Sequence, residues 1–171
     1  MSDAIKTDLY KQFNTQEPQL EAVLSSYFTI ESARESILDF LKWLKINGVS
    51  PIYSDFEGQS PLWELTYNDK SFYVVLYGAD NICIMMKIAF SHEYQTVMSD
   101  NNMQDVILNN LQYCSRKDGS HCGNCSLPPD VAGENYMIFG KEINNLCCGE
   151  FISFNNPDSK TVDGIKELLV L

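Results

Sequence analysis

Basic residues and histidines are scarce in this chain of 171 residues. Twelve Lys and Arg stand against 23 Asp and Glu, which gives a formal net charge of −11, and there are only two histidines. A field of that sign repels phosphate backbones and anionic lipid surfaces, so we expect neither nucleic acid nor a membrane as partner. The shortage of histidine also argues against a catalytic metal centre, because such centres usually combine His with carboxylate ligands.

Long apolar runs are lacking as well. No stretch approaches the roughly 20 apolar residues of a membrane span, and the N-terminal sequence MSDAIKTD shows no basic leader followed by an apolar segment. We therefore expect a soluble, cytoplasmic protein whose cysteines stay reduced. The GxSxG, Walker, dinucleotide-binding and HExxH strings are absent too, so the sequence nominates no catalytic residue and favours a non-enzymatic protein over an enzyme.

What the chain does contain is enough apolar material for one domain over residues 1–171. Hydrophobic residues make up 44% of the sequence and aromatic residues 12%, a composition typical of a globular domain. Residues 1–48 are expected to be helical, with short helices over Asp3–Phe13 and Pro18–Phe28. A longer helix is predicted from the capping-box pattern of Ser32 and Glu35 to the stop signal Asn47-Gly48. Its apolar stripe is formed by Ile37, Phe40, Leu41 and Leu44.

The pattern changes to that of strands over residues 49–90. Runs of aromatic and β-branched residues are separated by short turn sequences such as Asn68-Asp69, which predicts an antiparallel meander. One face of the last run is continuously apolar because alternate residues from Ile82 to Phe90 are hydrophobic. The expected strands are Ser50–Phe56, Leu62–Tyr67, Lys70–Tyr77 and Asn81–Phe90.

The remaining residues predict more helices and strands around a loop that carries cysteines. A helix is expected over residues 101–113 with Asp100 as its cap, followed by the loop at 114–135. Strands are predicted over Tyr136–Lys141 and Glu150–Phe154, and a last helix begins at Asn156-Pro157-Asp158. The fold class is therefore α+β: an antiparallel sheet, with a three-strand meander plus two C-terminal strands, and helices packed on one face.

Five of the six cysteines lie between residues 114 and 148. Cys122 and Cys125 are separated by two residues, a spacing at which two thiolates hold one metal ion. Coordination would also tie down the loop at 114–135, which has no apolar periodicity of its own. The sequence therefore predicts a structural zinc site as the cofactor site. Its preferred ligands are Cys114, Cys122, Cys125 and Cys148, with Cys147 or His121 as substitutes.

Two alternatives to zinc remain open for these cysteines. They could be free thiols on a loop, with Cys147 and Cys83 serving as small buried hydrophobic residues. The pair Cys122 and Cys125 could instead act as a dithiol switch in a thiol redox protein or sensor, since CxxC spacing lowers thiol pKa. The polar surroundings and the following Pro128-Pro129 are unlike the strand-to-helix junction of thioredoxin-type motifs, so we prefer zinc.

A small-molecule site is predicted in the meander. Aromatic side chains grouped with one carboxylate attract an organic cation, so a cationic aromatic small molecule is the expected ligand of a binding or interaction module. The alternative is that these aromatic residues form core and cross-strand pairs. The candidate ligand-binding residues are Trp63, Glu64, Tyr67, Tyr73 and Tyr77.

Several sequence strings resemble small bacterial α+β domain families of unknown function. They are the meander from Trp63 to Phe90, the string Phe139-Gly140-Lys141-Glu142, and Phe154 to Asp158 before the closing helix. The resemblance implies an α+β fold and a bacterial origin, and it transfers no catalytic residue. The aromatic meander with its carboxylate is also similar to GyrI-like effector-binding domains, which implies a ligand pocket on the sheet.

Overall fold

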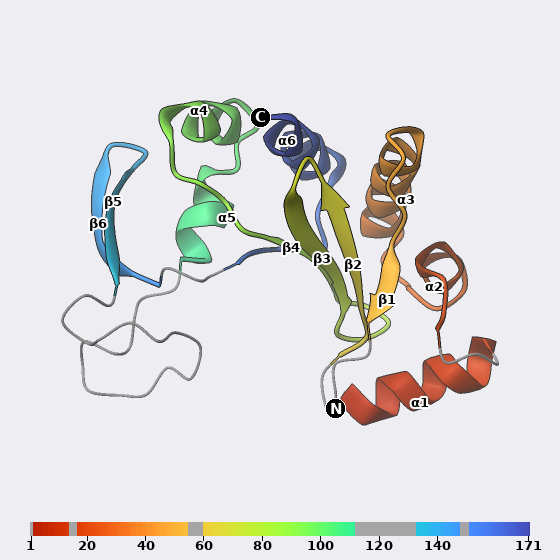
Figure 1. Ribbon diagram of the computed structural model, residues 1–171. Coiled ribbons are helices and arrows are strands. Elements are labelled where there is room, and N and C mark those ends of the chain that lie inside the picture. Colours follow the sequence, from red (N-terminus) through yellow and green to blue (C-terminus); the bar gives the residue numbers. More distant parts are fainter. Residues whose placement is uncertain (1, 14–16, 55–59, 112–132, 148–150) are drawn as a thin grey trace.

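The computed structural model describes residues 2–13, 17–54, 60–111, 133–147 and 151–171. Within these ranges the chain forms helices and strands in a mixed order, without regular alternation (Figure 1). The helices are α1 (Ser2–Phe13), α2 (Leu20–Ser26), α3 (Glu31–Ile46), α4 (His92–Asp100), α5 (Gln104–Asn109) and α6 (Ser159–Val170). The strands are β1 (Ile52–Ser54), β2 (Leu62–Tyr67), β3 (Lys70–Leu76), β4 (Ile82–Met86), β5 (Glu134–Ile138), β6 (Lys141–Leu146) and β7 (Ile152–Asn155).

Five strands form one antiparallel sheet in the order β1-β2-β3-β4-β7. The expected α+β class and the meander are therefore confirmed. The β2–β3 connection uses the predicted Asn68-Asp69 turn, whose two residues have φ angles of 48° and 60°. Positive φ at both central residues is the conformation of a tight hairpin turn, and it matches the twist of the flanking strands.

Two C-terminal strands were expected to join this sheet, but only β7 joins it, as the neighbour of β4. The segment predicted as a strand over Tyr136–Lys141 folds back on itself instead, because Phe139 and Gly140 have φ angles of 49° and 74° and make a turn. The result is a separate hairpin of β5 and β6, which lies apart from the large sheet (Figure 1).

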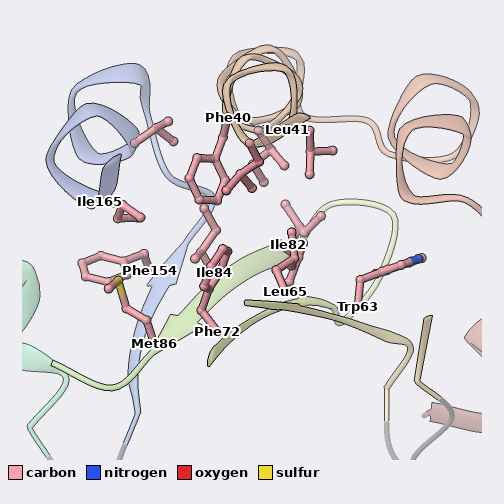
Figure 2. Packing of buried hydrophobic residues seen from close by; sticks show 14 of the residues in the cluster. Phe40, Leu41, Trp63, Leu65, Phe72, Ile82, Ile84, Met86, Phe154 and Ile165 are labelled. Carbon is pink, nitrogen blue, oxygen red and sulfur yellow. The ribbon is translucent and has the colours of Figure 1, made fainter. Parts of the chain in front are cut away.

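The core lies between the large sheet and the helices α3 and α6, which cover one of its faces (Figure 1). Figure 2 shows the sheet residues Phe72, Ile84 and Phe154 pointing toward Phe40 of α3 and Ile165 of α6. All five side chains are almost fully buried, and burial of each contributes about 1.5–3 kcal/mol. The stripe predicted for α3 is confirmed, since Ile37, Phe40, Leu41 and Leu44 are buried.

Helix termini differ from the sequence prediction at α3 and α6. Helix α3 begins at Glu31, because the Ile30 carbonyl already accepts a hydrogen bond from the Arg34 amide. Helix α6 begins at Ser159, and Asp158 is its cap, with Oδ1 accepting from Thr161 N at 2.8 Å. Asn156 does not cap the helix, because its Oδ1 accepts from the Ile82 amide at 3.1 Å and thereby extends the strand region.

The helix predicted over residues 101–113 is replaced by two shorter ones. Helix α4 ends at Asp100, so Asp100 closes a helix rather than capping the next one. Asn102, with φ of 55°, breaks the helical path before α5 begins. This break packs against Gly164 of α6, where a Cβ atom would lie 2.9 Å from the Cβ of Asn101. Among the described helices, none combines the length and the apolar character required to cross a bilayer.

Candidate functional site

The structure distributes the five residues of the predicted meander pocket over both faces of the sheet. Trp63 is 1% exposed, and its Nε1 donates to the Pro18 carbonyl at 2.9 Å, so its polar atom is already satisfied in the core. Tyr67 lies on the same side, and its ring meets that of Trp43 edge to face at 5.3 Å between centroids. Strand alternation directs Glu64 to the opposite side of the sheet from Trp63.

On that opposite face, Glu64 is in register with Tyr73 of β3. Tyr77 is 42% exposed, and its hydroxyl donates to the sulfur of Met85 at 3.7 Å. Burial and the neighbouring Cys83 thiol raise the pKa of Tyr77. The carboxylate therefore shares a surface with two tyrosines but not with Trp63 or Tyr67, and the structure does not bring the five residues into one pocket.

The predicted zinc ligands fall largely outside the described residues. Cys114, His121, Cys122, Cys125 and Cys148 lie in residues 112–132 and 148–150, and Cys147 is half-buried just after β6. Within the ranges that the structure describes, no group of three or more His, Cys, Asp and Glu side chains is placed to hold a metal ion.

A cleft of about 600 Å³ lies at the start of β3 and just after the end of β4. Here the chain leaves the sheet toward α4 (Figure 1). Its walls come from four separate parts of the chain: the β2–β3 turn, the segment from β4 into α4, the hairpin, and the residue before β7. We call it the aromatic–lysine cleft. It is lined by Asp69, Lys70, Ser71, Lys87, Ile88, Ala89, Phe90, Tyr94, Tyr136 and Phe151.

One ring contact joins two walls of the aromatic–lysine cleft, and a second holds a lining ring against the sheet. The rings of Phe90 and Tyr136 meet edge to face at 5.3 Å between centroids, and Phe151 meets Tyr73 in the same way at 5.4 Å. Such pairs hold aromatic rings in fixed orientations and add about 0.5–1.5 kcal/mol each beyond burial. The cleft therefore has stiff aromatic walls, which suit a flat ligand.

The hairpin of β5 and β6 is fastened to α4 by one side-chain amide. Gln95 Nε2 donates to the carbonyls of Phe90 at 2.7 Å and Met137 at 2.9 Å, and Gln95 Oε1 accepts from the Phe139 amide at 2.7 Å. The side-chain amide thus donates to one backbone group of the hairpin and accepts from another, as the backbone of a neighbouring strand would. Gln95 positions Tyr136, and with it one wall of the cleft.

The charges of the cleft come from two lysines and one aspartate. Lys70 Nζ donates to the last carbonyls of α6, at 3.1 Å to Leu169 and 3.5 Å to Leu168, and lies 5.9 Å from the centroid of the Tyr94 ring. A cation at that place satisfies carbonyls that lack helical partners. Lys87 is exposed, and with the residues that the structure describes it makes no hydrogen bond or ion pair.

Sequence reasoning missed this cleft because its lining residues are not neighbours in the sequence. Phe90 and Tyr94 are four residues apart and could have been paired on spacing alone, since Tyr94 lies in the first turn of α4. Tyr136 and Phe151 join them only through the fold of the hairpin and the pairing of β7. No spacing rule in the sequence groups residues so distant.

Comparisons with known proteins give no relative for this fold or this cleft: no protein-family model, no curated protein and no solved structure matches the chain. Arguments about function therefore depend on the geometry of the chain itself.

Proposed function

We propose that this protein is a cytoplasmic small-molecule-binding module and that the aromatic–lysine cleft is its binding site. The observation that carries the proposal is a cleft of about 600 Å³ whose lining contains four aromatic rings from three separate segments of the chain. Ligand sites commonly measure about 300–1,000 Å³ and combine apolar walls with a few polar groups. A flat aromatic molecule would replace water between the rings of Phe90, Tyr94, Tyr136 and Phe151.

A cleft-filling variant tests this proposal. Ala89 is exposed and lines the cleft, so Ala89→Phe should occupy ligand volume and weaken binding of 2-naphthamide, a neutral flat probe, at least about tenfold. Lys42→Phe, on the exposed side of α3 and outside the lining, is the matched control. Calorimetric titration measures the affinity. Equal binding by both variants would show that the probe sits elsewhere, and no binding by the unaltered protein would refute the proposal.

We also propose that the chain carries a structural zinc ion bound by Cys114, Cys122, Cys125 and Cys148. One observation supports this second role: the hairpin register pairs Glu134 with Leu146. Gly133 and Cys147, which follow outward from that pair, therefore lie at the same end of the hairpin. In the sequence, residues 112–132 precede Gly133 and residues 148–150 follow Cys147, so both cysteine-bearing segments connect to the described chain at this end of the hairpin.

Elemental analysis tests the zinc proposal. We expect about one zinc ion per chain, lost in Cys125→Ser and kept in Cys83→Ala, because Cys83 is buried in the sheet. Metal-free reduced protein in which all thiols except that of buried Cys83 are open to titration would contradict the proposal. A disulfide between Cys122 and Cys125 in metal-free protein would favour the alternative function of a thiol redox protein or sensor.

A further inference from the structure

We propose that the ligand of the aromatic–lysine cleft is an aromatic anion, a flat ring system that bears a carboxylate, sulfonate or phosphate group. The inference rests on the proposed function, that the cleft binds a small molecule, and it adds the sign of the ligand's charge. It assigns the anionic group to Lys87 and the ring to the aromatic walls around Tyr94 and Tyr136.

The charge of the lining is opposite to that of the whole chain. The cleft has Lys70 and Lys87 against Asp69, which is two positive charges and one negative, or +1, whereas the chain carries −11. Charges within a few ångströms act on a bound ligand strongly, while exposed charges beyond about 8–10 Å are largely screened at physiological salt. A ligand in the cleft therefore experiences a local field that favours an anion.

The two lysines differ in how many of their N–H donors remain unused within the described part of the chain. The ammonium of Lys70 already donates to the Leu168 and Leu169 carbonyls, so it contributes mainly a fixed positive charge beside the Tyr94 ring. The ammonium of Lys87 has three N–H donors, and none is used by a residue in the described part of the chain. Lys87 is therefore the group that can bind an anionic substituent directly.

Asp69 and Glu134 limit how the anion can lie. Asp69 is exposed in the β2–β3 turn next to Lys70. Glu134 lies outside the lining, and its carboxylate accepts a hydrogen bond from the Tyr136 hydroxyl. An anionic substituent would avoid both carboxylates, which leaves the side of the cleft formed by Lys87, Ile88 and Ala89. A cationic group on this side of the cleft would be repelled by the ammonium of Lys87, so binding of a cation is disfavoured here.

The inference is tested with four probes that share one ring system. They are 2-naphthoate, 2-naphthyl phosphate, the neutral 2-naphthamide and the cationic 2-naphthylmethylammonium. We expect at least one anion to bind about tenfold more tightly than the amide, because hydrogen bonds to charged groups are stronger than neutral ones. Comparison of the carboxylate with the phosphate distinguishes the two kinds of anion. Calorimetric titration is repeated at raised salt, where the preference should shrink.

Three variants assign the preference to Lys87. Lys87→Met removes the charge and keeps an apolar stem, so the anion should fall to the affinity of the amide. Lys87→Arg keeps the charge and should keep the preference. Lys42→Met removes an exposed lysine on α3, outside the cleft, and should change nothing. Melting temperatures of all variants verify that they remain folded.

The outcomes separate this inference from the proposed function. If the amide binds as tightly as both anions, or if Lys87→Met keeps the preference, the inference is overturned while the cleft remains a binding site. Tightest binding of the cation would overturn it as well. If none of the four probes binds, the proposed function fails and the inference fails with it.

Discussion

Replacement of Gly164 by alanine tests how closely α6 packs against the α4–α5 junction. Gly164 lies within α6 and is buried. A Cβ atom there would approach the Met103 sulfur most closely, and would lie 2.9 Å from Asn101 Cβ and 3.2 Å from Asn101 Cγ. Cβ atoms essentially never come within 3.0 Å of such neighbours, so α6 or the junction must move.

Two opposing effects decide the sign of the change in stability. Alanine is favoured over glycine inside a helix by about 0.8–1.0 kcal/mol. Insertion of an extra carbon into a packed interior costs about 1–3 kcal/mol. Met103 is only 1% exposed, which limits how far its side chain can give way. We therefore expect Gly164→Ala to lower the free energy of unfolding by about 1 kcal/mol.

Urea unfolding followed by circular dichroism measures this change, and thermal unfolding should show a melting temperature lower by about 2–4 °C. The Met103→Ala background provides a control: with the sulfur removed, the same glycine replacement should cost less. A Gly164→Ala protein that is more stable than the unaltered one would refute the argument, because it would mean that helix propensity outweighs the close approach.

Three further predictions concern single side chains. Asp158→Ala should lower stability by about 1 kcal/mol at pH 7 through loss of the helix cap. The Thr161 amide lowers the pKa of Asp158, so the stabilisation by the cap is fully present above the unfolded pKa near 3.9 and disappears as pH falls through the folded pKa. Unfolding curves of the two proteins should therefore converge in acid. Cys83, whose pKa burial raises to about 12, should resist alkylation at pH 8 in the folded protein and react after unfolding, as read by mass spectrometry; fast labelling would contradict the buried position. Glu64→Gln should leave binding of cationic dyes unchanged, because Glu64 and Trp63 face opposite sides of the sheet; a loss of affinity would restore the meander pocket.

Local periodicity in the sequence predicted the parts of the fold that are periodic. The stripe of α3 follows from apolar residues three and four positions apart, and the Asn68-Asp69 turn follows from the strand patterns of period two on either side of it. Both are found as expected. The sequence does not predict the hairpin of β5 and β6, because the expected strand Tyr136–Lys141 runs through Phe139-Gly140. Gly140 has a φ of 74°, a conformation that glycine adopts readily, and the glycine is the sequence signal for this turn.

The candidate site was harder to predict than the fold for a physical reason. Aromatic residues in a meander alternate between the two faces of the sheet, so Trp63 and Tyr67 belong to the main core whereas Tyr73 packs against a smaller cluster on the other face. Residues of a cleft, in contrast, are grouped by how separate segments meet. Tyr136 reaches Phe90 only because Gln95 holds the hairpin against α4, and that contact has no periodic signature.

The attachment of the hairpin through Gln95 would make affinity for the proposed ligand depend on any equilibrium in which the hairpin opens. A two-stranded hairpin is marginally stable alone, and in the described part of the chain the hydrogen bonds that join this one to α4 come from the amide of Gln95. Whenever the hairpin detaches, Tyr136 leaves the cleft, and the apparent dissociation constant rises in inverse proportion to the attached fraction. Weakening of the hydrogen bonds of the Gln95 amide would thus act as a graded control on the proposed binding, through a side chain that does not itself line the cleft.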